Sequence, residues 1–174
     1  LVPIIDAGVR IDEKDETCQE GLAKDYFCKK ADGTPFVAAV WPGKAYFADF
    51  LRPEVREWFG GRYKVLTDLG IEGFWNDMNE PALFYSPDRL KAFFDSMAEM
   101  SKMPNIEQED FFEKVVGGVM GLMNSPEDYA SFYHEVNGQR IRHDRVHNLY
   151  GGSMTRAAGE ALAKERPDKR TLLY

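Results

Sequence analysis

The sequence predicts an α/β fold, in which helices alternate with the strands of a parallel sheet. Three apolar runs have the pattern of strands, and they cover Ile4–Asp6, Ile71–Asp77 and Thr171–Tyr174. A helical pattern separates each pair of runs, over Arg52–Gly70 and Asn148–Glu165. Because a helix is the usual connection between two parallel strands, this order is typical of a barrel or an open α/β sheet.

The second run carries the strongest strand signal. It is apolar from Ile71 to Trp75 and polar from Asn76 to Glu80, and Pro81 prevents the strand from continuing. The first run, Ile4–Asp6, also ends in a carboxylate. Chemistry in these folds takes place at the carboxyl ends of strands, so both strand ends are candidate functional positions.

Both predicted helices have recognisable ends. The first opens with Pro53 followed by an acid, and Gly70 caps it. Gly60 and Gly61 interrupt it, which suggests close packing against a neighbour. The second helix is rich in alanine, as packing on a sheet requires, and it ends before Pro167.

Two insertions are predicted on the rim of the sheet. The first covers about residues 10–45. Its residues 10–25 are charged and irregular, which predicts a surface loop. Asp32-Gly33 then predicts a hairpin between Tyr26–Cys28 and Phe36–Trp41, which would bring Trp41 towards the site.

The second insertion covers about residues 82–146. We expect helices over Ser86–Lys102 and Glu109–Met123, the latter with its phenylalanines and valines directed inward. Ser125 begins a further helix, and Asn137-Gly138 predicts a second hairpin. Insertions of this size are usually functional because they overhang the site.

The composition excludes several classes of protein. Apolar side chains make up 44% of the 174 residues, as a globular core requires, and the net charge of −7 argues against nucleic-acid or anionic-membrane partners. No apolar run approaches the roughly 18 residues of a transmembrane span. Cys18 and Cys28 favour reduced thiols over a disulfide, so we expect a cytoplasmic protein. The chain starts and stops within strand-type sequence, so we expect a segment of a longer protein.

Asp77 is the main candidate for chemistry. A carboxylate at a strand end can be a nucleophile, a general base, a metal ligand or a helix cap. Amide donors from Asn76 and Asn79 would keep it ionised. Trp75 and Met78 offer apolar contact to a sugar ring. A bracing role for Asp77 is the structural alternative.

Retaining glycoside hydrolysis needs a second carboxylate roughly 5–5.5 Å from the nucleophile. Glu80 and Asp6 are the candidates, and for both we favour a supporting hydrogen-bonding role. His134, His143 and His147 raise the possibility of a metal site, but their spacing favours solvated or packing side chains. The sequence contains neither a phosphate-binding glycine loop nor a serine nucleophile elbow.

The stretch Trp75–Pro81 resembles the signature of glycoside hydrolase family 31, which contains α-glucosidases and α-xylosidases. Further resemblances follow in the family's order along nearly the whole chain: Ile4-Ile5-Asp6, Val40-Trp41-Pro42-Gly43, Asp49-Phe50, Arg52-Pro53-Glu54-Val55, His147-Asn148-Leu149-Tyr150-Gly151 and Met154-Thr155-Arg156-Ala157. Within the family the chain looks closest to bacterial α-glucosidases of the gut-commensal type.

The resemblance implies part of a (β/α)8 TIM barrel, about its third and fourth units and the start of the fifth. It implies that Asp77 is the nucleophile that forms a glucosyl–enzyme intermediate. The glucose subsite would be lined by Trp41, Trp75 and Met78. Ile4 would touch the sugar, and Asp6 would support the subsite from behind. The family's acid/base is an aspartate after a later strand, beyond Tyr174. Neither a metal nor another cofactor is implied.

Four readings of function therefore stand. The leading one is a segment of an α-glucosidase that acts on α-glucoside oligosaccharides. The alternatives are an α-xylosidase of the same family, a non-catalytic carbohydrate-binding module and a metal-dependent hydrolase that uses the histidines. The expected partners are the substrate, the remainder of the barrel and, in a homo-oligomer, a second copy.

Overall fold

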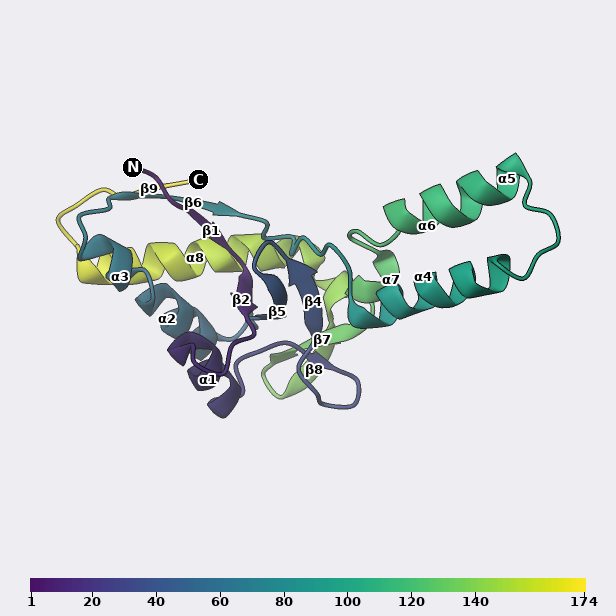
Figure 1. Ribbon diagram of the computed structural model, residues 1–174. Helices are drawn as coiled ribbons and strands as arrows, with labels where there is room; N and C mark the ends of the chain where they lie inside the picture. Colours follow the sequence, from purple (N-terminus) through teal and green to yellow (C-terminus); the bar gives the residue numbers. More distant parts are fainter.

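The computed structural model describes residues 1–174 (Figure 1). The strands are β1 (Ile4–Asp6), β2 (Gly8–Arg10), β3 (Lys29–Lys30), β4 (Val37–Val40), β5 (Gly43–Phe47), β6 (Gly73–Asp77), β7 (Phe132–Val136), β8 (Gln139–Arg142) and β9 (Leu172–Leu173). The helices are α1 (Glu16–Ala23), α2 (Pro53–Gly61), α3 (Lys64–Thr67), α4 (Pro87–Met100), α5 (Gln108–Asp110), α6 (Gly117–Met120), α7 (Pro126–Tyr129) and α8 (His147–Glu165). A π-helical turn, η1 (Phe111–Val116), and a 3-10 turn, η2 (His143–Arg145), complete the chain.

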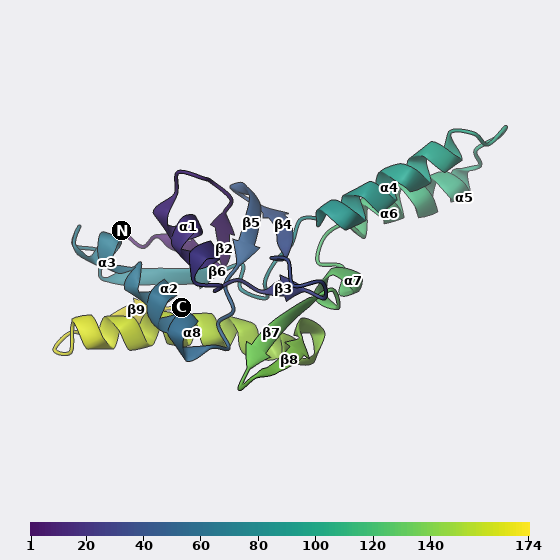
Figure 2. The same cartoon turned by 90° about the horizontal axis from the view of Figure 1, so that it is seen from below.

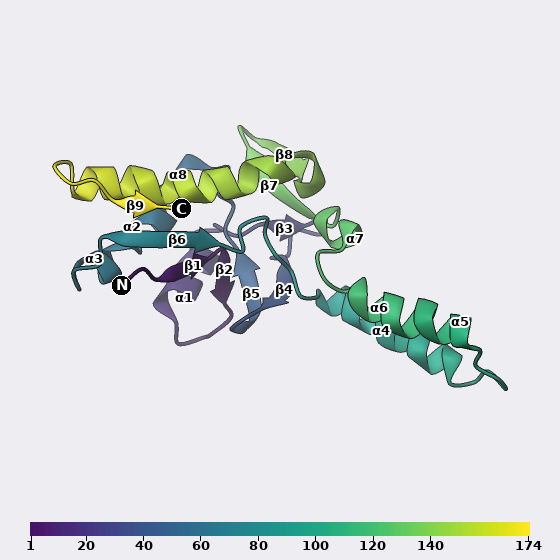
Figure 3. The same cartoon turned by 90° about the horizontal axis from the view of Figure 1, so that it is seen from above.

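The three predicted strands form one parallel sheet, in the order β1-β6-β9. Helices α2 and α8 lie side by side along this sheet (Figures 1 and 3). A Cβ atom on Gly60 of α2 would lie 2.3 Å from the carbonyl oxygen of Ala157 in α8. The two helices can therefore approach this closely only because residue 60 has no side chain.

Alternation along β6 gives the sheet two different faces. Phe74 is fully buried, and its ring lies 5.0 Å from that of Tyr63, just after α2. Asn76 points to the same buried side and accepts a hydrogen bond from the Tyr63 hydroxyl. Trp75 and Asp77 project from the opposite face, which the helices leave uncovered.

The two insertions form two small antiparallel sheets, β2-β5-β4 and β3-β7-β8. They pack together through aromatic rings: Phe36 of the first insertion stacks on Phe132 of the second with 4.2 Å between ring centroids. Both rings belong to the main hydrophobic core. The small sheets of both insertions therefore belong to one packed body with the parallel sheet.

The first insertion differs from the prediction in two ways. Residues 10–25 contain helix α1 in place of an irregular loop, and Asp15 caps it by accepting from the Cys18 backbone N–H at 2.7 Å. The charged residues that suggested a loop occupy the exposed side of this helix and its approach.

The predicted Asp-Gly turn forms, with the Phe36 N–H bonded to the Cys28 carbonyl, but it joins only short segments. The main hairpin is β4–β5, which turns at Trp41-Pro42, whereas β3 pairs with β7.

Two helix predictions also need correction. The helix expected over Arg52–Gly70 is divided into α2 and α3 by a break at Arg62-Tyr63. The segment Glu109–Met123 is helical, but its phenylalanines and valines do not point inward. Phe111 and Phe112 are about half exposed, because α4 and the α5–α6 segment extend away from the body as a helical hairpin (Figures 1 to 3). None of the helices combines the length and apolar character that crossing a membrane requires.

Candidate functional site

The carboxyl ends of β1 and β6 bring two aspartates together. In the parallel register Asp6 lies opposite Asp77 and Ile4 lies opposite Trp75. Residues two apart on a strand share a face, so all four side chains project from the uncovered face of the sheet. Asp6 and Asp77 therefore end neighbouring strands and lie on the same side of the sheet.

Asp77 stands at the start of a constrained loop. Its Oδ1 accepts a hydrogen bond from the Met78 backbone N–H at 2.9 Å. Met78 has a positive φ of 54°, a backbone conformation that costs a residue with a side chain free energy. Such a conformation persists only where the surrounding structure fixes it. The loop after β6 is therefore built to present Asp77 in one orientation.

Asn76 does not support Asp77 as the sequence suggested. Its side chain faces the helices and bonds to Tyr63, on the side of the sheet away from Asp77. Asn79 packs against α8 instead, where a Cβ on Gly151 would lie 2.9 Å from the Asn79 carbonyl oxygen. Neither amide therefore donates to the Asp77 carboxylate.

Asp6 has an unusual electrostatic environment. Burial raises the pKa of the Asp6 carboxyl, and the adjacent negative charge of Asp77 raises it further. Its Oδ1 is buried and has no hydrogen-bond partner within the chain. Two carboxylates this close resist simultaneous ionisation, so Asp6 takes up a proton more readily than an isolated aspartate.

Exposed aromatic rings lie on the strand of Asp77 and on the hairpin that contacts the segment after it. Trp75 is 37% exposed and stacks on Tyr174, with 5.7 Å between ring centroids. Trp41 is 73% exposed at the tip of the β4–β5 hairpin and meets Phe84 edge-on at 4.9 Å. Mutual backbone hydrogen bonds of Ala39 with Phe84 and Tyr85 tie this hairpin to the loop that follows Asp77. Exposed flat rings beside carboxylates are suited to contact a sugar.

Phe84 and Tyr174 were not predicted as members of this group of aromatic rings. Period-2 alternation from Leu172 gives the side of the sheet on which Tyr174 projects, so its position was within reach of the sequence. Phe84 follows a loop, and no local pattern indicates that it meets Trp41, 43 positions earlier in the printed sequence.

The three histidines form a continuous hydrogen-bonded chain. His134 Nε2 lies 2.9 Å from His143 Nδ1, and His143 Nε2 lies 2.9 Å from His147 Nδ1. His134 and His143 are fully buried, which makes the packing alternative correct for them and the solvated one wrong. Four of the six ring nitrogens bind one another, so the three rings are not arranged to ligate a common metal ion.

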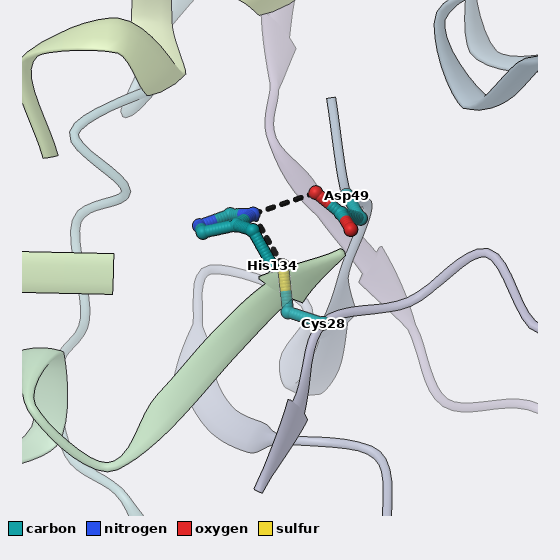
Figure 4. Close-up of side chains that lie close together, drawn as sticks. All are labelled: Cys28, Asp49 and His134. Atoms are coloured by element: carbon teal, nitrogen blue, oxygen red, sulfur yellow. Dashed lines mark hydrogen bonds and ion pairs between the residues drawn. The ribbon is translucent and has the colours of Figure 1, made fainter. Parts of the chain in front are cut away.

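A second cluster combines His134 with Cys28 and Asp49 (Figure 4). Their potential ligand atoms lie within 4.8 Å of one another, and all three residues are buried. His134 Nδ1 lies 2.6 Å from Asp49 Oδ1 and 3.5 Å from Cys28 Sγ. Burial raises the pKa of the Cys28 thiol, and the Asp49 charge raises it further, whereas a metal ligand must be a thiolate. A metal ion would have to displace the histidine–aspartate hydrogen bond, so the donors are arranged as a hydrogen-bonded cluster.

Comparison with protein families identifies the chain. The model of the glycosyl hydrolases family 31 TIM-barrel domain matches residues 1–174. The chain belongs to glycosyl hydrolase family 31. The family assignment and the parallel sheet with its two helices confirm the predicted segment of a TIM barrel.

Several members of family 31 resemble the chain over nearly its whole length. Alpha-glucosidase 2 of Bacillus thermoamyloliquefaciens is 34% identical over 173 residues, which cover 99% of this chain and 17% of that relative. An alpha-glucosidase of Saccharolobus solfataricus is 29% identical over 150 residues, or 86% of this chain and 19% of the relative. A crystal structure of the glucosidase II alpha subunit superimposes with a TM-score of 0.65 at 26% identity, covering 99% of this chain and 15% of that one. The chain thus spans less than a fifth of the length of these relatives.

Proposed function

We propose that the protein containing this chain is a retaining α-glucosidase in which Asp77 is the nucleophile. The observation that carries the proposal is the position of Asp77 at the carboxyl end of a parallel barrel strand, opposite Asp6 and on the same strand as the exposed Trp75. Catalytic side chains of TIM-barrel enzymes occupy this end of the strands.

The geometry suggests a division of roles. The Asp77 carboxylate would attack the anomeric carbon and form a covalent glycosyl ester, which water then hydrolyses. Trp41, Trp75, Met78 and Ile4 would contact the sugar through their apolar surfaces. Asp6 would support Asp77 from the neighbouring strand. An acid/base aspartate elsewhere in the barrel, as the resemblance implies, would protonate the leaving oxygen.

Substrate class is supported by the relatives. Two relatives that match most of this chain, at 34% and 29% identity, are alpha-glucosidases. Alpha-xylosidase 1 of Arabidopsis thaliana is 43% identical over 86 residues, which keeps α-xyloside as a second candidate. Comparison of kcat/KM for 4-nitrophenyl α-glucoside and 4-nitrophenyl α-xyloside separates the two, and we expect the glucoside to be preferred.

The nucleophile is tested by covalent trapping of the full-length protein with a 5-fluoro-α-glucosyl fluoride. We expect the mass label on the peptide that contains Asp77, because that carboxylate forms the ester. Asp77→Asn should lose the label and lower kcat by roughly 10³-fold or more. Asp95→Asn, which changes an exposed aspartate on α4, is the matched control and should behave as wild type. A label on Asp6 would overturn the assignment. A protein that binds sugar but shows neither label nor turnover would favour the carbohydrate-binding module.

A cytoplasmic location is a separate proposal. It is supported by Cys18 and Cys28, which are both buried as free thiols. Proteins of oxidising compartments more often pair their cysteines. Fractionation of the source cells, with immunodetection of the protein, tests this proposal.

A further inference from the structure

A chain of four polar side chains crosses the core behind the candidate site. It begins at Asp49, which follows β5, and continues through His134 on β7 and His143 in η2 to His147 at the start of α8. The successive separations are 2.6, 2.9 and 2.9 Å. Asp49, His134 and His143 are at most 2% exposed. This hydrogen-bonded series of side chains thus connects the segment after β5, the second insertion and helix α8.

Asp49 determines the direction in which the hydrogen bonds of this series are donated. Its carboxylate accepts from the Glu135 backbone N–H through Oδ2 at 2.7 Å and lies against His134 Nδ1 through Oδ1. A carboxylate can only accept, so the His134 proton must be on Nδ1. In a neutral imidazole Nε2 is then an acceptor, which requires the proton of His143 to be on its Nδ1, and by the same argument that of His147 on its Nδ1. One buried charge therefore determines the tautomers of three rings.

The histidines of this series contact the loop that follows Asp77 through Tyr129. Tyr129 lies against the rings of His143 and His147, with centroids 5.4 and 4.7 Å away, and its hydroxyl donates to the Pro81 carbonyl at 2.9 Å. This hydrogen bond holds the backbone at Pro81, three residues after the left-handed Met78.

We propose that Asp49 is a positioning residue, which acts through His134 and His143 to fix the loop Met78–Pro81 and thereby the orientation of the Asp77 carboxylate. The backbone of Met78 is strained, so it needs an external constraint to persist. The buried chain supplies that constraint from a residue 28 positions before Asp77 in the sequence. This inference rests on the proposed function for its kinetic consequence, but the tautomers can be measured without it.

The same residues are not a second catalytic centre. A cysteine–histidine–aspartate triad requires the thiol and the carboxylate on different ring nitrogens, whereas Cys28 and Asp49 both lie against Nδ1 of His134. Cys28 is 1% exposed, so a substrate cannot reach it. The cluster acts on the site through structure alone.

The first test measures tautomers by ¹⁵N NMR of the full-length protein, with histidines labelled and assigned through His134→Gln, His143→Gln and His147→Gln. At pH 8, where histidine is ordinarily neutral, we expect all three rings as Nδ1–H forms. Asp49→Asn should destroy this uniform pattern, since a carboxamide can also donate. An Nε2–H form of His143 in wild type, or stoichiometric zinc that Cys28→Ser removes, would overturn the proposal.

The second test is kinetic and uses the full-length protein, with active sites counted by covalent trapping. Asp49→Asn should lower kcat per active site by about 10–100-fold and change KM less than about threefold, because a displaced nucleophile slows chemistry more than binding. Asp144→Asn, an exposed carboxylate of η2 that pairs with Arg142, is the matched control and should keep kcat.

A smaller change covers the case in which Asp49→Asn does not fold. Tyr129→Phe keeps the ring contacts and removes only the hydrogen bond to Pro81, so kcat should fall about 3–10-fold by the same displacement of the loop. Unchanged kcat per active site in the folded variants would overturn the proposal. Inactivity of the wild-type protein would instead refute the proposed function and leave the NMR result to decide the tautomers.

Discussion

At the scale of single residues, burial determines the protonation of His143. It is fully buried, and burial lowers its pKa to about 3, with further lowering from the neighbouring imidazoles of His134 and His147. An unfolded histidine titrates near 6.5. Between these two values the unfolded state binds a proton that the folded state does not. Stability should therefore rise with pH across this window and be lost as the pH falls below about 6.5.

Acid unfolding tests this consequence. We expect the free energy of unfolding of the full-length protein, from urea titrations between pH 8 and 4, to decrease by a few kcal/mol through loss of the His143 contribution. His143→Gln should show a weaker pH dependence over the same range. Subtracting one pH profile of unfolding free energy from the other removes the contribution of the carboxyl groups that both proteins contain. Parallel pH profiles of wild type and variant would contradict the buried neutral state of His143.

At the scale of elements, the contact between α2 and α8 depends on one glycine. A Cβ on Gly60 would lie 2.3 Å from the Ala157 carbonyl oxygen and 2.8 Å from the Ala161 Cβ. The neighbouring Gly61 belongs to the same helix, and nothing lies within 4 Å of the Cβ position there. The packing of α2 on α8 therefore requires glycine at position 60 but not at position 61.

Opposite effects of alanine at these positions are expected. Gly60→Ala should destabilise the full-length protein by about 1–3 kcal/mol, because α2 must move away from α8. Gly61→Ala should be neutral or stabilise by up to about 1 kcal/mol, because alanine favours helix over glycine. Thermal unfolding of both variants measures the difference. Equal effects would show that the helices do not pack as closely as the structure indicates.

The whole molecule exposes much apolar surface. The sheet β1-β6-β9 has unpaired edges, and its residues Ile4 and Leu172 are more than half exposed. The helical hairpin adds Phe112 and Met120, at 55% and 74% exposure. Apolar patches and open strand edges of this kind are surfaces on which proteins associate.

The isolated 174-residue chain is therefore expected to self-associate. Sedimentation velocity at micromolar concentrations should show species larger than a monomer of 19.9 kDa. The isolated chain should also fail to hydrolyse 4-nitrophenyl α-glucoside, because a nucleophile without a general acid lacks a factor of roughly 10²–10⁴ in rate. Turnover by the isolated chain that Asp77→Asn abolishes would contradict the second expectation, and a monodisperse monomer would contradict the first.

Local features of the fold were predictable because short-range physics creates them. Ser86 and Ser125 cap α4 and α7 as their sequences indicate, each accepting from a backbone N–H three residues later. Asn137 and Gly138 form the turn between β7 and β8 with positive φ at both positions. Helix α1 was missed because charged residues on one exposed face outweighed the capping signal of Asp15.

The sequence by itself determined the α/β order, the strand that ends at Asp77 and the family signature around it, since these depend on periodicity, caps and neighbouring residue types. Only the tertiary structure decided that Asp6 lies opposite Asp77, that Asn76 faces the helices, and that Asp49 meets His134 across 85 positions of sequence. Such contacts depend on which strands pair and in which register, and a local pattern does not specify the distant residue that completes a pair. Burial then set the chemistry, because Asp49 can orient three imidazoles only where water does not compete for their hydrogen bonds.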